Sequence, residues 1–162
     1  MKDRYLIAIT LAIVVLQTTV LQLLRIGGVL PNLMLIWLII AIVLFGRFVG
    51  IRTAIYAGLF SDILIGKGLA VHLSIYLVIA IIISSMEEKI FKDNYVTPVV
   101  LIMTTTVFYH VFFLVVHYFA TGNINLLKWV FTITLPEMIY NLAIGVVVYT
   151  QSFKWQMGYR MR

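Results

Sequence analysis

Apolar residues run along this chain in long blocks, and the polar positions gather in short intervals between the blocks. Strands of a membrane barrel would alternate polar and apolar positions, and that alternation is missing here. A helix needs about 20 apolar residues to cross a bilayer, which is close to the length of most blocks. The pattern therefore predicts an all-α polytopic membrane protein.

The blocks predict six membrane-spanning helices in one integral membrane domain covering residues 1–162. Their expected bounds are 5–24, 29–45, 52–65, 69–86, 97–120 and 126–150. The third is short and rich in glycine, and the second contains Pro31, which suits a first helical turn. The connections are too short to hold a water-soluble domain.

The composition agrees with a bilayer as the solvent. Hydrophobic residues make up 63% of the chain and charged residues only 11%, whereas a soluble domain has roughly 45–50% and about 25%. Cysteine is absent, which excludes disulfides, cysteine-ligated metals and thiol nucleophiles. We expect no cofactor and no metal.

Lysine and arginine are distributed unevenly between the two sides that this layout defines. With the N-terminus inside, nine lie in inner segments and three in outer loops: Lys2, Arg4, Arg47, Arg52, Lys89, Lys92, Lys154, Arg160 and Arg162 against Arg25, Lys67 and Lys128. Cytoplasmic loops of membrane proteins carry such an excess. Both termini are thus predicted to be cytoplasmic, and the net charge of +6 reflects topology rather than nucleic-acid binding.

The third block carries small residues at intervals of four, namely Gly46, Gly50, Ala54 and Gly58. This spacing places them along one helix face, where small side chains permit the close approach of a second helix. We expect packing inside the protein, and the alternative is a face for a partner protein.

Asp62 follows on the same face, about one turn from the outer end of its helix. A carboxylate inside a membrane is costly and usually faces the bundle interior or a wet cavity. We favour a structural role, in which Asp62 accepts hydrogen bonds from backbone amides near the turn at Gly66 and Gly68 or pairs with Lys67.

Further polar residues suggest a cavity open to the outside. His72 and His117 lie with Asp62 in the outer half of the bilayer, and Glu137 and Asn141 lie near its middle. Glu137 is the most deeply placed acid, which makes it the strongest candidate for a functional group.

A metal site is not expected at the histidines. His110 and His117 share a face of the fifth span, but zinc sites usually show closer spacing or cysteine partners. Hydrogen bonds between helices are the preferred interpretation. No serine-protease, paired-aspartate or glycine-rich phosphate motif is present, so we expect no enzymatic activity.

Two segments carry a resemblance to a known family. The second span opens with PNLMLI from Pro31, and the third runs through an aspartate and a glycine turn into the fourth as YAGLFSDILIGKGLAVHLSIYLV. In these segments and in its length, the chain resembles the MreD family of bacterial rod shape-determining membrane proteins.

The resemblance implies a non-enzymatic component of the cell-elongation complex in the bacterial cytoplasmic membrane. It further implies binding to the single-span protein MreC and a link to MreB filaments and cell-wall synthases. The family is also similar in fold to the substrate-binding subunits of energy-coupling-factor vitamin transporters. A vitamin-uptake subunit is therefore the alternative, and an ion or proton pathway through Glu137 and the histidines is a weaker one.

Overall fold

The computed structural model describes residues 3–65, 70–86, 96–123 and 125–160. These residues form helices and loops and contain no β-strand, which confirms the predicted all-α class. The helices are α1 (Asp3–Thr18), the 3₁₀ helix η1 (Val20–Leu24), α2 (Leu33–Phe45), α3 (Arg47–Leu64), α4 (Val71–Ser85), α5 (Val96–Thr121), α6 (Leu126–Trp129), the π-helix η3 (Val130–Thr134) and α7 (Leu135–Arg160). The positions Lys2, Gly66, Lys67, Gly68, Lys89, Lys92 and Arg162, which the sequence-based predictions used, lie outside the described residues.

Three helical stretches of the described chain are long and apolar enough to cross a membrane: Asp3–Leu23, Val96–Thr121 and Leu126–Gly158. Helices α2 and α4 are also apolar but have only 13 and 15 residues. At 1.5 Å per residue they measure roughly 20 and 22 Å, less than the ~30 Å of a hydrocarbon core. The protein is thus an integral membrane protein by composition, and the six-span layout stays a prediction.

Several helix ends differ from the expected bounds, and backbone geometry gives the reasons. Helix α2 begins at Leu33 because the side chain of Asn32 caps it by accepting a hydrogen bond from the amide of Leu35, and a turn at Gly27 and Gly28, both at positive φ, precedes this cap. Helix α3 begins at Arg47, five residues earlier than expected, because Gly46 (φ 92°) ends α2 and lets the next helix start at once. The last helix runs on to Arg160 rather than ending at 150.

Helix α2 forms the centre of the molecule. Of its 13 residues, 10 are buried, and it contacts α1, α3, α4, α5 and α7. A helix that is hydrophobic on every side is typical of a protein core or a membrane span, and here the surrounding helices bury it. The other helices cover it, and their outward faces remain apolar, as a lipid environment requires.

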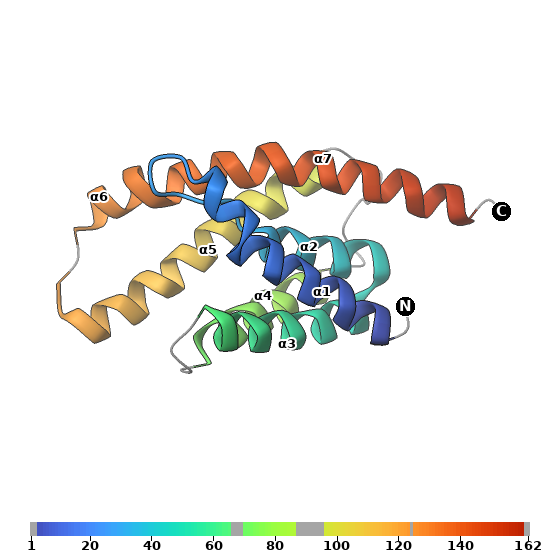
Figure 1. The fold of residues 1–162 in the computed structure, drawn as a ribbon, viewed down its shortest axis with the longest axis horizontal. Coiled ribbons are helices and arrows are strands. Elements are labelled where there is room, and N and C mark those ends of the chain that lie inside the picture. Colours follow the sequence, from blue (N-terminus) through green and yellow to red (C-terminus); the bar gives the residue numbers. More distant parts are fainter. Residues whose placement is uncertain (1–2, 66–69, 87–95, 124, 161–162) are drawn as a thin grey trace.

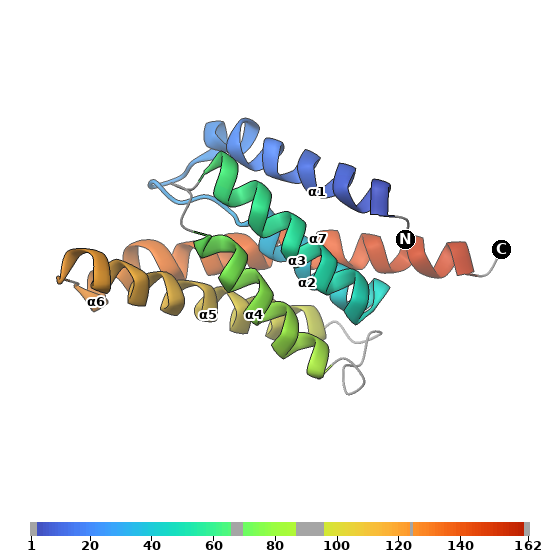
Figure 2. The same cartoon turned by 90° about the horizontal axis from the view of Figure 1, so that it is seen from below.

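The long helices α5 and α7 run along the long axis, and α1 to α4 gather beside one half of them (Figure 1). The start of α1 and the end of α7 lie at the same end of the molecule in both views (Figure 2). Two contacts tie this end together, an ion pair between Arg52 and Asp3 and a hydrogen bond of 2.5 Å from Gln156 to the carbonyl of Leu44.

Candidate functional site

A polar network joins three helices in the interior. Asn32 caps α2, since its side chain accepts a hydrogen bond of 3.1 Å from the amide of Leu35. Its own backbone amide donates to Oδ1 of Asn141 in α7 at 2.7 Å. The Nδ2 of Asn141 in turn donates to Thr106 of α5 at 3.1 Å. Asn141 and Thr106 are fully buried, so the polar groups of one asparagine link α2, α5 and α7.

Aromatic rings continue this network toward α4. The hydroxyl of Tyr76 lies 3.5 Å from Oδ1 of Asn32. The ring of Tyr76 stacks on that of Tyr109, with centroids 6.1 Å apart and planes 17° from parallel. These two tyrosines place hydroxyl groups beside the amides and enclose the network between α4 and α5.

Glu137 is positioned by a local irregularity of its helix. Pro136 has no N–H to donate and its ring clashes with a regular α-helical turn before it. The chain adopts a π-turn over Val130–Thr134, where the amide of Leu135 bonds to the carbonyl of Val130. Such turns are a known response to strain inside a helix. The result brings Glu137 against α5.

On α5 the neighbour of Glu137 is His110. Its Nε2 lies 3.1 Å from Oε2 of Glu137, and the two side chains are only 6% and 12% exposed. The distance is short, yet the atoms are not aligned as a hydrogen bond, and Oε1 of Glu137 has no hydrogen-bond partner in the described part of the chain. The carboxylate thus keeps free acceptor capacity in a buried place.

A polar pocket of about 160 Å³ lies beside this carboxylate. The connection between η1 and α2 forms most of its wall, and other side chains complete it. The lining residues are Gln17, Arg25, Gly28, Val29, Leu30, Pro31, Asn32, Tyr109, Ile133 and Glu137. Among the predicted cavity residues, only Glu137 faces this pocket, and Asn141 reaches it indirectly through Asn32.

Asp62 and His72 form a separate cluster. Oδ1 of Asp62 accepts hydrogen bonds from the amide (3.0 Å) and Nδ1 (2.8 Å) of His72, and Oδ2 accepts one from the amide of Leu73 (3.0 Å). Both side chains are about 10% exposed. The carboxylate therefore caps the first turn of α4, and neither residue lines the polar pocket.

His117 lies apart from the other histidines. It is exposed near the end of α5, and its ring packs on Trp129 with centroids 5.5 Å apart. Two helical turns, roughly 10 Å, separate it from His110. Among the described residues, no three side chains of histidine, cysteine, aspartate or glutamate gather as a metal site would need.

The small residues of α3 face other helices of the same chain. A Cβ on Gly50 would collide with Ile42 of α2, and one on Gly58 would collide with Leu73 of α4. Ala54, between them, is fully buried. Packing within the chain therefore occupies this face.

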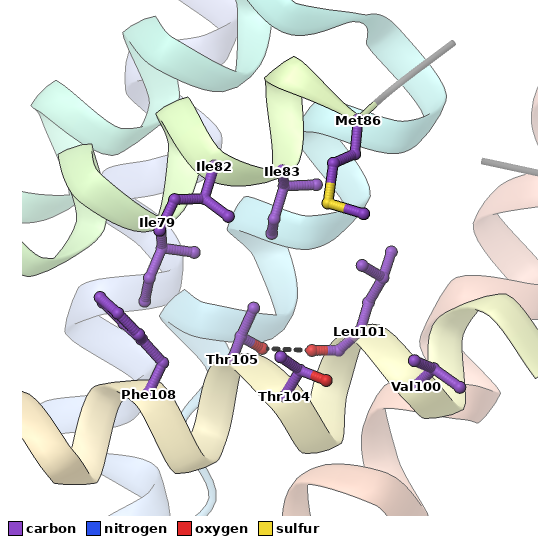
Figure 3. A pocket seen from close by; sticks show the side chains of 9 residues that line it. All are labelled: Ile79, Ile82, Ile83, Met86, Val100, Leu101, Thr104, Thr105 and Phe108. Carbon is purple, nitrogen blue, oxygen red and sulfur yellow. Dashed lines mark hydrogen bonds between the residues drawn. The ribbon is translucent and has the colours of Figure 1, made fainter. Parts of the chain in front are cut away.

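A second pocket, of about 170 Å³, is apolar and lies between α4 and α5 (Figure 3). Thr104 and Thr105 are its only polar lining side chains, and the hydroxyl of Thr105 is already bonded to the carbonyl of Leu101 at 2.6 Å. This space offers dispersion contacts only and has no group that fixes a polar ligand.

Sequence reasoning missed four members of the polar network: Asn32, Tyr76, Thr106 and Tyr109. A signal existed for Asn32, because an asparagine directly before an apolar run is typical of a helix N-cap. The sequence around Tyr76, Thr106 and Tyr109 contains no comparable signal. A threonine in an apolar helix usually bonds to a carbonyl of its own helix, and a tyrosine usually packs through its ring.

Comparison with known proteins completes the description. The sequence model of the family described as rod shape-determining protein MreD matches residues 3–157. Comparisons with curated proteins and with solved structures gave no match.

Proposed function

This chain belongs to the MreD family of rod shape-determining proteins, and we propose that it acts as a non-enzymatic assembly component of the cell-elongation complex. In this role it binds MreC and links it to MreB filaments and cell-wall synthases. The protein resides in the bacterial cytoplasmic membrane with six spans and both termini inside.

The observation that best supports an assembly role is how the described chain uses its buried polar groups. Asp62 caps a neighbouring helix, and Asn32 and Asn141 join three others. Interhelical bonds of this kind hold transmembrane helices in fixed positions. A rigid core with apolar outer faces suits a protein that acts by packing against other membrane helices.

The arrangement of the ends supports an even number of spans. The start of α1 and the end of α7 lie together (Figures 1 and 2). Five described basic residues belong to helix segments near that end, namely Arg4, Arg47, Arg52, Lys154 and Arg160. Arg25 lies in the connection before α2, and Lys128 lies in the short helix α6. This distribution favours a cytoplasmic location of the termini.

The family match gives no support to the alternative of a vitamin-uptake subunit. Depletion of the protein in its rod-shaped host is the experiment that tests the proposed role. We expect cells to round up, with shape restored by a plasmid copy and not by added vitamins. Normal rods with a nutritional requirement would overturn the proposal.

Partner binding needs a second measurement. Affinity-tagged protein purified from membranes should retain MreC, and a different single-span membrane protein expressed at the same level serves as the control. Equal recovery of both single-span proteins would contradict a specific interaction.

A further inference from the structure

The polar pocket beside Glu137 is lined by two side chains of opposite charge, the buried Glu137 and the exposed Arg25. Glu137 lines the pocket and is 9% exposed, and its Oε1 is enclosed by protein atoms without a hydrogen bond from any described group. Arg25 lines the same pocket from the exposed connection before α2, and it forms no ion pair with a described carboxylate. The other oxygen of Glu137, Oε2, lies 3.1 Å from Nε2 of His110 but is not aligned with it as a hydrogen bond. A buried carboxylate that lacks hydrogen bonds is costly, so a ligand that donates to it stabilises the protein as well.

From this arrangement we propose that the pocket binds a zwitterion with a primary ammonium group and an anionic group. The ammonium donates its hydrogens to the carboxylate of Glu137 where this side chain lines the pocket, and the phosphate or carboxylate contacts the guanidinium of Arg25. Charge-assisted bonds of this kind are about twice as strong as neutral ones.

The volume limits the ligand further. At ~30 Å³ per water molecule in the liquid, a pocket of about 160 Å³ holds a group the size of about five waters. Drug-sized molecules occupy pockets of roughly 300–1,000 Å³, so neither a nucleotide nor a vitamin of comparable size fits. A phosphoethanolamine group or a small amino acid does fit.

This chemistry has two sources, the headgroup of phosphatidylethanolamine and a free zwitterion in solution. The site is independent of the role in cell elongation, because it rests only on the pocket and on its two charges. The test therefore uses the purified full-length chain.

Native mass spectrometry of the protein released from nanodiscs containing equal amounts of phosphatidylethanolamine and phosphatidylglycerol measures the preference directly. Phosphatidylglycerol carries the anion without the ammonium. We expect retained phosphatidylethanolamine to exceed phosphatidylglycerol roughly tenfold, which is the effect of one charge-assisted hydrogen bond. Phosphatidylcholine, whose quaternary ammonium has no N–H, should be retained as weakly as phosphatidylglycerol.

Variants test each charge separately. Glu137→Gln keeps the shape and removes the charge, and Arg25→Ala changes an exposed connection without touching the core. Glu137→Gln should abolish the preference for phosphatidylethanolamine. Arg25→Ala should lower the retention of both lipids, because each carries the phosphate. Lys128→Ala, which removes an exposed cation outside the pocket, should change neither. Unchanged thermal unfolding midpoints show that each variant is folded. If Glu137→Gln does not fold, the lipid retention of Arg25→Ala tests whether the pocket is the binding site.

Free phosphoethanolamine distinguishes the two sources. If it raises the unfolding midpoint in detergent and displaces the lipid, the site accepts the soluble zwitterion; if only the lipid is retained, the headgroup is the ligand. Either outcome supports the proposal. Equal retention of all three lipids with no response to phosphoethanolamine would overturn it, as would two folded pocket variants that behave like wild type.

Discussion

The carboxylate of Asp62 in α3 binds His72 in α4 at two places, the backbone amide at 3.0 Å and the ring Nδ1 at 2.8 Å. Its second oxygen accepts a hydrogen bond from the amide of Leu73. The residue before α4, Ala70, has no polar side chain to cap the helix. Asp62 therefore supplies from a different helix the cap that the local sequence lacks.

Asp62→Ala should destabilise the protein by about 2–4 kcal/mol, because a cap is lost and two buried amides are left without partners. Asp62→Asn keeps one carbonyl acceptor and should fall between wild type and alanine. Thermal unfolding in detergent and abundance in the membrane measure the effect. Ser74→Ala is the matched control, since that hydroxyl is exposed and bonds only to the carbonyl of Ala70 at the same helix end. Equal midpoints for Asp62→Ala and Ser74→Ala, with normal cell shape, would contradict the capping role.

Gly58→Ala should cost about 1–3 kcal/mol through overpacking, because the new Cβ would lie 2.9 Å from the amide nitrogen of Leu73 and backbone cannot move aside easily. Gly145→Ala meets side-chain atoms of Ile102 (2.5 Å) and Ile36 (3.3 Å) but no backbone, so it should cost less. Gly158→Ala has open space around it and should stabilise the helix slightly. Unfolding by SDS ranks the three variants, and any other order would show that the crossing of α3 and α4 is not this close.

Asn141 and Thr106 should be energetically coupled. Asn141→Ala removes the acceptor of the Asn32 amide and should cost about 1–3 kcal/mol. In a double-mutant cycle with Thr106→Val we expect a coupling of about 0.6 kcal/mol and at most about 1.7, the range found for interhelical bonds in membranes. The same cycle with Asn123→Ala, an exposed residue, serves as the control and should be additive within ~0.5 kcal/mol. A coupling energy as small as that of the control would contradict a stabilising hydrogen bond between Asn141 and Thr106.

The topology can be tested with single cysteines, because the chain has none of its own. Phe48, at the start of α3, is 69% exposed, and Leu127 in α6 is 72% exposed. A membrane-impermeant maleimide added to intact cells lacking an outer membrane should label Leu127→Cys. It should label Phe48→Cys only after permeabilisation. Labelling of both from the outside would rule out the proposed orientation.

The helical class and the family follow from the chain itself because each depends on local information. A block of apolar residues forms a helix in lipid whatever surrounds it, since every backbone polar group must be bonded within the segment. The helix ends were less well predicted. The start of α2 is set by the cap of Asn32, and its end is set by the positive φ of Gly46. Neither a side-chain cap nor a backbone angle can be read from hydropathy.

The site was predicted only in part, for a related reason. The sequence by itself determined that Asp62, Glu137 and Asn141 are carried inside apolar helices, where each needs a partner. The tertiary structure decided which partner each one found. Asp62 bonds to the first turn of α4. Asn141 bonds to Asn32 and Thr106. Glu137 lies beside His110 and lines the polar pocket. These contacts join residues 10 to 109 positions apart, and only the packing of whole helices brings such distant groups within hydrogen-bond distance.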